Sequence, residues 1–122
     1  MEVSESLAEF WRNSDGARLF EDREYGQWGL VLLSPSLAAE RSRQLQDERP
    51  REYREGDLVV GEFLGDSDLL LVRCDRKAED FGSVLVVLPL DPRHDWFQVS
   101  SDFESFLVDY ERAQGAKFWE RS

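Results

Sequence analysis

The pattern of apolar and polar positions predicts a short helix near the N-terminus. Ser6 and Glu9 have the spacing of a capping box, in which each side chain satisfies a backbone N–H at a helix start. Three apolar residues then fall on one helical face: Leu7, Phe10 and Trp11. Residues 13–16 (NSDG) predict the turn that ends this helix, because Asp-Gly readily supplies the positive φ of a tight turn.

Two strands are predicted after this turn. Ala17–Glu21 is short, and Trp28–Leu33 is nearly all apolar, as in a strand buried on both faces. Asp22–Gln27 is a polar connection between them. Pro35 ends the second strand, because proline cannot donate to a strand ladder.

Residues 36–54 predict a second, weakly amphipathic helix. Either Ser34 or Ser36 begins it, since both are good N-cap residues. Pro50 disfavours helical geometry at Arg49, so the helix ends or kinks there. Its mixed Glu and Arg pattern is typical of a solvated face.

The next section predicts strands at close spacing: Leu58–Leu64, Leu69–Cys74 and Gly82–Leu88. Residues 65–68 (GDSD) have a turn composition that indicates a hairpin between the first two. Asp75–Phe81 is a longer polar loop before the third. No connection is long enough for a crossover helix, so these strands form an antiparallel meander, which Pro89 and Pro92 end.

The last predicted element is a helix with an aromatic face. Ser101 and Glu104 form a second capping box. The apolar stripe follows at helical spacing and is interpreted as core: Phe103, Phe106, Leu107 and Tyr110. Gly115 stands where a C-terminal cap belongs. The whole pattern predicts an α+β fold, with an antiparallel sheet flanked by helices, in one domain over residues 1–122.

Composition supports a real core for this domain. The chain has 122 residues, of which 41% are hydrophobic and 12% aromatic. A chain of this length buries roughly two-thirds of the surface that its unfolded form exposes. The N-terminus is acidic where a signal peptide is basic, and no apolar run approaches the about 20 residues of a membrane span. We therefore expect a cytoplasmic protein with no membrane partner.

The charge is strongly acidic, with a formal net charge of −11. Residues 34–55 have five acids and five bases, whereas the segments before and after them are both net acidic. Nucleic-acid binding needs lysine and arginine to neutralise phosphates, so direct binding of nucleic acid is not expected. The charge suits either a basic partner or solubility alone.

Candidate chemistry is sparse. Cys74 ends an apolar strand and is interpreted as a small buried hydrophobe rather than a nucleophile. His94 and Asp95 are neighbours on a segment expected to be extended, where adjacent side chains point to opposite faces and pair poorly. Asp66 and Asp68 suggest calcium, but a calcium loop needs more oxygen ligands, so a hairpin turn is preferred. No catalytic set, cofactor or metal site is predicted.

The order of elements resembles the SUKH superfamily, the Smi/Knr-type domain of yeast cell-wall regulators and many bacterial immunity proteins. Four stretches show the likeness: LAEFWRNSDGARLF (7–20), YGQWGLVLLSP (25–35), GDLVVGEFLGDSDLLLVRCD (56–75) and residues 82–115. Only six residues precede Leu7, where family members have a further helix, so the N-terminal part of the family's fold is expected to be shortened. The resemblance implies a non-catalytic domain that binds another protein, in immunity proteins a toxin that is often a nuclease.

A basic toxin domain is thus the expected partner, with a regulatory scaffold for an endogenous protein as the alternative and a small acidic enzyme as a third. Candidate partner-binding acids lie in predicted loops: Asp66, Asp68, Glu79, Asp80, Asp91 and Asp95. Trp96 is either an exposed anchor of that surface or a core residue that closes the sheet.

Overall fold

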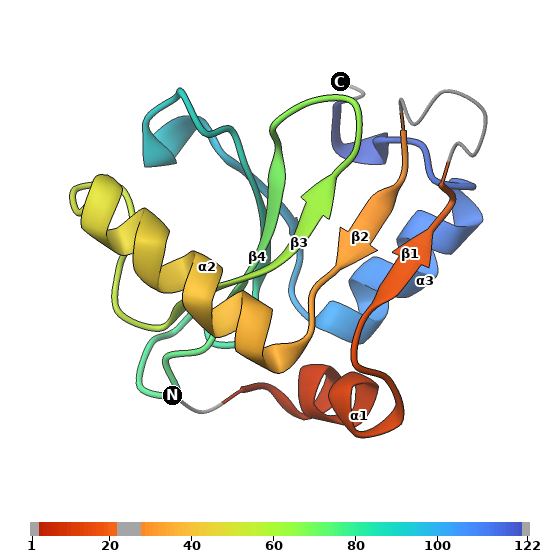
Figure 1. The fold of residues 1–122 in the computed structure, drawn as a ribbon, viewed down its shortest axis with the longest axis horizontal. Coiled ribbons are helices and arrows are strands. Elements are labelled where there is room, and N and C mark those ends of the chain that lie inside the picture. The colour runs from red at the N-terminus through yellow and green to blue at the C-terminus, as the bar shows by residue number, and fades with distance from the viewer. Residues whose placement is uncertain (1–2, 22–27, 121–122) are drawn as a thin grey trace.

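Six strands form one sheet and pair in the order in which they follow along the chain (Figure 1). The structure, a computed structural model, describes residues 3–21 and 28–120. The strands are β1 (Ala17–Leu19), β2 (Leu30–Leu32), β3 (Asp57–Phe63), β4 (Leu69–Arg73), β5 (Val84–Val87) and β6 (Phe97–Ser100). Every neighbouring pair is antiparallel, which confirms the predicted meander. The predicted connection at residues 22–27 lies outside the described residues.

The meander does not end at Pro89 and Pro92 as predicted, because β6 follows them and pairs with β5. A short 3-10 helix, η1 (Arg93–Asp95), connects these two strands. β6 has only four residues and none of them is buried, so its apolar pattern is too weak to identify a strand.

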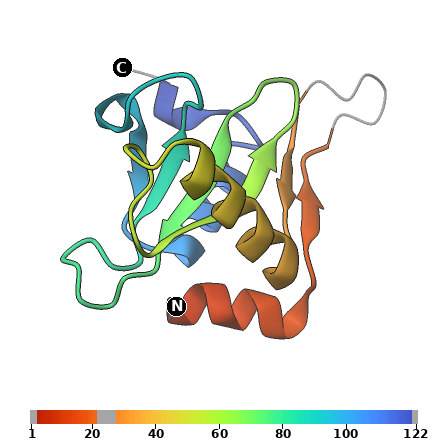
Figure 2. The same cartoon turned by 60° about the vertical axis from the view of Figure 1, so that its left-hand side comes forward.

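Helices cover both faces of the sheet, as the α+β prediction requires. They are α1 (Glu5–Asn13), α2 (Pro35–Glu48), α3 (Phe103–Arg112) and the short 3-10 helix η2 (Phe118–Glu120). Figures 1 and 2 show α2 on one face, with α3 on the other and α1 across the lower end. Of the two predicted N-caps of α2, Ser34 is the one observed, and the helix ends at Glu48 with Arg49 as its C-cap, ahead of Pro50.

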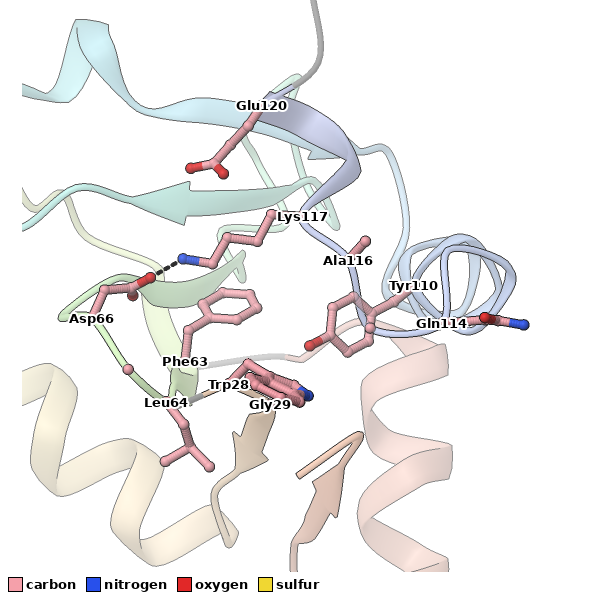
Figure 3. Close-up of a pocket in the computed structure, with 12 residues that line it drawn as sticks. Trp28, Gly29, Phe63, Leu64, Asp66, Tyr110, Gln114, Ala116, Lys117 and Glu120 are labelled. Atoms are coloured by element: carbon pink, nitrogen blue, oxygen red, sulfur yellow. Dashed lines mark hydrogen bonds and ion pairs between the residues drawn. The ribbon is translucent and has the colours of Figure 1, made fainter. Parts of the chain in front are cut away.

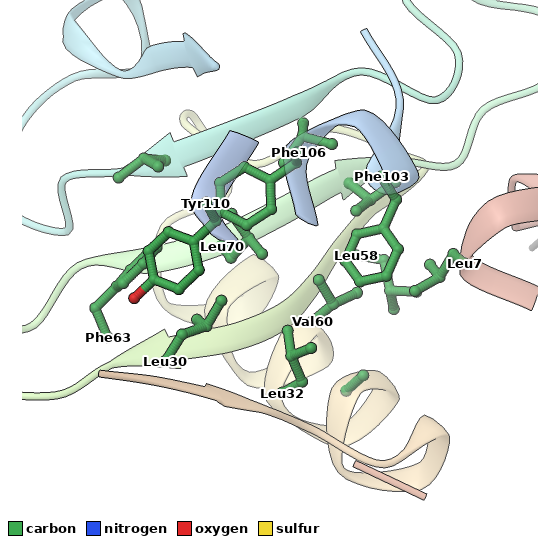
Figure 4. Packing of buried hydrophobic residues seen from close by; sticks show 14 of the residues in the cluster. Leu7, Leu30, Leu32, Leu58, Val60, Phe63, Leu70, Phe103, Phe106 and Tyr110 are labelled. Carbon is green, nitrogen blue, oxygen red and sulfur yellow. The ribbon is translucent and has the colours of Figure 1, made fainter. Parts of the chain in front are cut away.

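The side chains of the central strands alternate between two apolar clusters. On β4, Leu70 and Val72 face α3, whereas Leu69 and Leu71 face α2. The aromatic stripe of α3 is buried over the first of these faces (Figure 4). Full burial of one such large apolar side chain contributes about 1.5–3 kcal/mol. The predicted core role of the last helix is therefore confirmed.

The N-caps of α1 and α3 differ from the predicted ones. Ser4 caps α1, and Asp102 caps α3 by accepting from the Ser105 amide at 3.3 Å. The predicted cap Ser6 instead donates its hydroxyl to the other oxygen of Asp102 at 2.6 Å. This bond joins the starts of two helices that lie 96 residues apart in sequence, and it holds them side by side.

The end of α3 also departs from expectation in detail. Gln114 has the left-handed conformation, with φ of 55°, and Gly115 follows it. The Gly115 amide donates to the Tyr110 carbonyl at 3.1 Å, and the Gln114 amide donates to the Glu111 carbonyl at 2.9 Å. These two bonds form a Schellman motif, in which the left-handed position is usually glycine.

Candidate protein-binding surface

The predicted partner-binding acids lie in three separate connections of the sheet. Asp66 and Asp68 are in the β3–β4 turn, and residues 79–80 are in the β4–β5 loop. Asp91 and Asp95 are in the β5–β6 connection. Successive connections of an antiparallel meander alternate between the two ends of the sheet. Residues 79–80 therefore lie at the opposite end from the others, and these acids form no single patch (Figure 1).

The two aspartates of the β3–β4 turn are already engaged by one cation. Lys117, between α3 and η2, pairs with Asp66 and lies 3.4 Å from Asp68. Burial and the charge of Asp66 raise the pKa of Asp68, although Lys117 opposes this shift. Asp68 also donates its amide to the Asp66 side chain at 2.9 Å, as in a hairpin turn. Much of the negative charge of this turn is thus neutralised within the chain.

His94 and Asp95 lie closer together than predicted. The segment is a 3-10 helix and not extended, so His94 Nε2 comes within 3.5 Å of the Asp95 carboxylate. The prediction that these side chains are poorly placed to pair is therefore wrong. The His94 side chain is 80% exposed, and its nearest charged partner is at the surface, so this pair has no enclosed site for a reaction.

The Trp96 side chain is buried in the core. Only 7% of the residue is exposed, and its ring packs 5.2 Å from that of Tyr53. The indole N–H lies 3.2 Å from the carbonyls of both Leu88 and Asp91. Of the two interpretations left open by the sequence, the core position is the one that the structure supports.

An ionic cluster lies buried on the α2 face of β3 and β4. Asp57 is 1% exposed, and its carboxylate accepts from Arg73 at 2.8 Å and from Arg93 at 2.5 Å. Asp80 accepts from the other side of Arg73 at 3.1 Å. Burial alone would lower the pKa of Arg73, but the hydrogen bonds and charges of Asp57 and Asp80 raise it. Asp80 thus belongs to a cluster that links loops to the sheet, and no sequence pattern reveals this cluster.

A shallow depression opens beside the β3–β4 turn (Figure 3). Its volume is about 600 Å³, with Phe63 and Tyr110 on one wall and the Lys117 ion pair on another. Trp28 stands at its margin and is 55% exposed, although the sequence placed it in a strand buried on both faces. The depression has both signs of charge and one exposed aromatic side chain.

A second depression, which we call the α1–α3 groove, follows from the pairing of Ser6 with Asp102. Its volume is about 490 Å³. The polar lining consists of Glu5, Ser6, Glu9, Asn13, Asp102 and Glu104, and the apolar lining of Phe10, Phe103 and Leu107. Four carboxylates and no basic side chain therefore surround an apolar floor. The sequence contains these residues in two helices about 90 positions apart, so periodicity within each helix did not reveal the groove.

The described residues offer little for catalysis. Cys74 is 3% exposed, and burial raises the pKa of its thiol to about 12, which keeps it protonated and supports its interpretation as a small hydrophobe. Within residues 3–21 and 28–120, no three His, Cys, Asp or Glu side chains gather where they could hold a metal ion. Nor is any helix of these residues long and apolar enough to cross a membrane.

Comparison with known proteins gives one result. A sequence model of the SMI1 / KNR4 family (SUKH-1) matches residues 1–109. This match spans the sheet and most of α3. No curated protein and no solved structure matches the chain significantly.

Proposed function

The chain belongs to the SMI1 / KNR4 family (SUKH-1), and from that premise we propose that it acts by stoichiometric protein binding, as an immunity protein that neutralises a toxin. Members of this family are generally non-catalytic immunity or regulatory domains. Family membership is the observation that carries the proposal, and the surface chemistry agrees with it.

The surface supports a basic partner. The net charge is −11, and exposed acids occur in the loops and at the helix starts, among them Glu5, Glu79 and Glu104. A toxin that acts on nucleic acid presents basic side chains around its phosphate-binding site, and an acidic protein is steered toward such a surface. Asp91, Asp95 and Glu79 are the loop acids that contribute to this steering in our proposal, whereas Lys117 already pairs with Asp66 and Asp68. Trp96 is not included, because its side chain is buried.

We place this neutralisation in a bacterial cytosol, where an immunity protein meets an incoming toxin. The direct test is coexpression of the chain with each toxin domain encoded beside its gene. We expect restored growth with one of them, and a one-to-one complex after mixing the purified proteins. An unrelated acidic protein of similar size and charge serves as the control and is expected to give no protection.

Two results would count against this function. One is the absence of both protection and complex formation with every neighbouring toxin domain. The other is equal protection by the acidic control, since this would reduce the effect to net charge. Recovery of an endogenous cellular protein with no neighbouring toxin gene would favour the regulatory-scaffold alternative.

A further inference from the structure

The α1–α3 groove combines an apolar floor with a rim of one charge sign. Phe103 is buried under the floor, and its ring meets that of Phe10 edge-on at 5.7 Å between centroids. Leu107, one turn further along α3, is partly exposed beside them. Phe10 and Leu107, which are both partly exposed, give a binding partner apolar contact area without a rearrangement of the core.

The rim keeps its negative charge. Glu5 and Glu104 have no ion-pair partner among the described residues, and both are exposed. Among the described residues, the ion-pair partner of Glu9 is Arg12, at 2.8 Å, in a contact where both side chains are about two-thirds exposed, and the Asn13 side-chain amide donates to Glu9 at 3.3 Å. An exposed ion pair of this kind contributes little to stability, so it leaves Glu9 available to another cation.

The helix starts that meet at this groove do not make it an anion site. The Ser4 hydroxyl accepts from an amide in the first turn of α1, and the Asp102 carboxylate does the same in α3. The first turn of each helix also has an acidic residue, Glu5 in α1 and Glu104 in α3, so negative charge stands where a bound anion would approach and repels it. The complementary ligand is cationic.

We propose that the α1–α3 groove binds a basic segment of a protein partner, with one apolar side chain on the floor between lysine or arginine side chains that meet the rim. This inference rests on the proposed function, because it assigns the interface of a protein-binding domain. It also separates roles: the groove fixes the bound segment, whereas the loop acids at the two ends of the sheet act at longer range.

The first test uses a defined probe, a synthetic helical peptide with leucines on one face flanked by lysines. Titration of the isotope-labelled chain with this peptide is expected to shift the amide resonances of α1 and of the first two turns of α3. A counterpart peptide with glutamate in place of lysine is expected to cause no shifts.

Matched variants test the rim and the floor separately. Glu5→Gln with Glu104→Gln is expected to weaken peptide binding about fivefold, whereas Glu40→Gln with Glu48→Gln on α2, which changes the net charge equally, leaves it within about twofold. Leu107→Ser is expected to weaken binding about tenfold, from lost apolar burial. Val108→Ser, on an exposed position one residue further along the same helix, is expected to have no effect.

Three outcomes overturn the groove assignment. These are shifts confined to the loop acids, equal losses in the rim pair and the α2 pair, or self-association of the free chain that Leu107→Ser abolishes, which would make a second copy the occupant.

The toxin assay keeps this proposal distinct from the function. Full protection by a groove variant that no longer binds the peptide would contradict the groove as the toxin interface while leaving the immunity function intact. Peptide binding at the groove without protection against any toxin would contradict the function and leave the groove as a site for basic segments.

Discussion

At the scale of single residues, the most consequential side chain is the buried carboxylate of Asp57. It accepts hydrogen bonds from two guanidinium groups and from the Arg54 backbone amide. A buried ion pair need not stabilise a fold relative to apolar residues, but removal of one partner leaves the other charge without compensation. The cluster is therefore sensitive to the loss of any single member.

We expect Asp57→Ala to lower the free energy of unfolding by about 3–5 kcal/mol, because Arg73 then remains buried without the one carboxylate that is buried beside it. The control is Asp95→Ala, at a largely exposed carboxylate, which is expected to change stability by less than about 0.5 kcal/mol. Urea unfolding measures both. Similar small losses in the two variants would mean that Arg73 reaches solvent.

The buried Cys74 thiol and the buried Tyr110 phenol predict a loss of stability at alkaline pH. Burial raises the pKa of Cys74 from 9.0 to about 12, and that of Tyr110 from 10.0 to about 12. Above each usual pKa the unfolded chain has released a proton that the folded chain still binds. Stability therefore falls as pH rises, from pH 9 for Cys74 and from pH 10 for Tyr110, with a slope of up to about 1.4 kcal/mol per pH unit for each group.

Urea unfolding between pH 8 and pH 11 measures these slopes. Cys74→Ala is expected to flatten the decline between pH 9 and pH 10, and Tyr110→Phe the decline above pH 10. Rapid alkylation of native Cys74 at pH 8 would contradict the burial on which this prediction rests.

At the scale of elements, the Ser42 hydroxyl links α2 to the sheet by a hydrogen bond. The register of β3 shifts between Val59 and Gly61 against β4. The Val59 amide donates instead to the buried Ser42 hydroxyl at 2.7 Å, and this hydroxyl donates to the Ala38 carbonyl at 2.7 Å. Ser42 thus satisfies a backbone group that the strand ladder leaves unpaired.

Ser42→Ala is expected to cost about 1–3 kcal/mol, because the Val59 amide then stays buried without an acceptor. Faster hydrogen exchange at the Val59 amide would accompany this loss. Ser105→Ala, at an exposed position in α3, serves as the control and should leave stability nearly unchanged. An unaltered Val59 exchange rate in the Ser42 variant would show that another acceptor replaces the hydroxyl.

The Schellman motif at the end of α3 predicts a stabilising substitution. Gln114 adopts a left-handed conformation, which costs an L-residue roughly 1–2 kcal/mol, whereas glycine avoids this cost and loses part of the gain through its greater freedom when unfolded. Gln114→Gly is therefore expected to raise the free energy of unfolding by about 0.5–1 kcal/mol. The measurement is the midpoint of thermal unfolding, which should rise with it. Gln44→Gly, inside α2, is expected to cost about 1 kcal/mol. A change in unfolding free energy of the same sign in the two variants would contradict the left-handed conformation of Gln114.

The sequence predicted the type and order of most elements, because their periods and turn residues are local signals. It failed where two local candidates competed and a distant contact decided between them. Ser4 and Ser6 both suit a helix start, and only the position of Asp102 shows why Ser6 is engaged elsewhere. The choice between an exposed and a core position for Trp96 also depends on a distant contact, the Tyr53 ring that lies 43 residues earlier.

The candidate surface was harder to predict from the sequence than the fold. Loop acids could be identified in the sequence, but their partners Lys117 and Arg73 come from other segments of the chain. Neither ion pair follows from spacing. The α1–α3 groove was missed for the same reason, since it exists only where two capped helix starts meet.

At the scale of the whole molecule, the charge is large enough to affect how fast a partner arrives. A net charge of −11 attracts a basic partner over distances near the Debye length, which is about 10 Å at 0.1 M salt. The close contacts of a bound complex are screened much less than this approach.

For the toxin complex that we propose, we expect salt to slow association more than it changes dissociation. Raising the salt from 0.05 to 0.5 M is expected to lower the association rate constant by about tenfold or more and to change the dissociation rate constant by less than about threefold. Stopped-flow fluorescence measures both constants. A dominant effect on dissociation would place the important charges inside the interface and not in the long-range field.

The order of the strands has a consequence for how the chain acquires its structure. Since each strand pairs with its neighbour in sequence, the sheet has a low contact order and can grow strand by strand as the chain leaves the ribosome. The exception is the closing layer, because α3 and η2 follow all six strands yet cover Leu30 of β2 and Phe63 of β3. Until they emerge, one face of the sheet is open, and the emergence of α3 and η2 is the step at which the nascent domain ceases to be prone to aggregation.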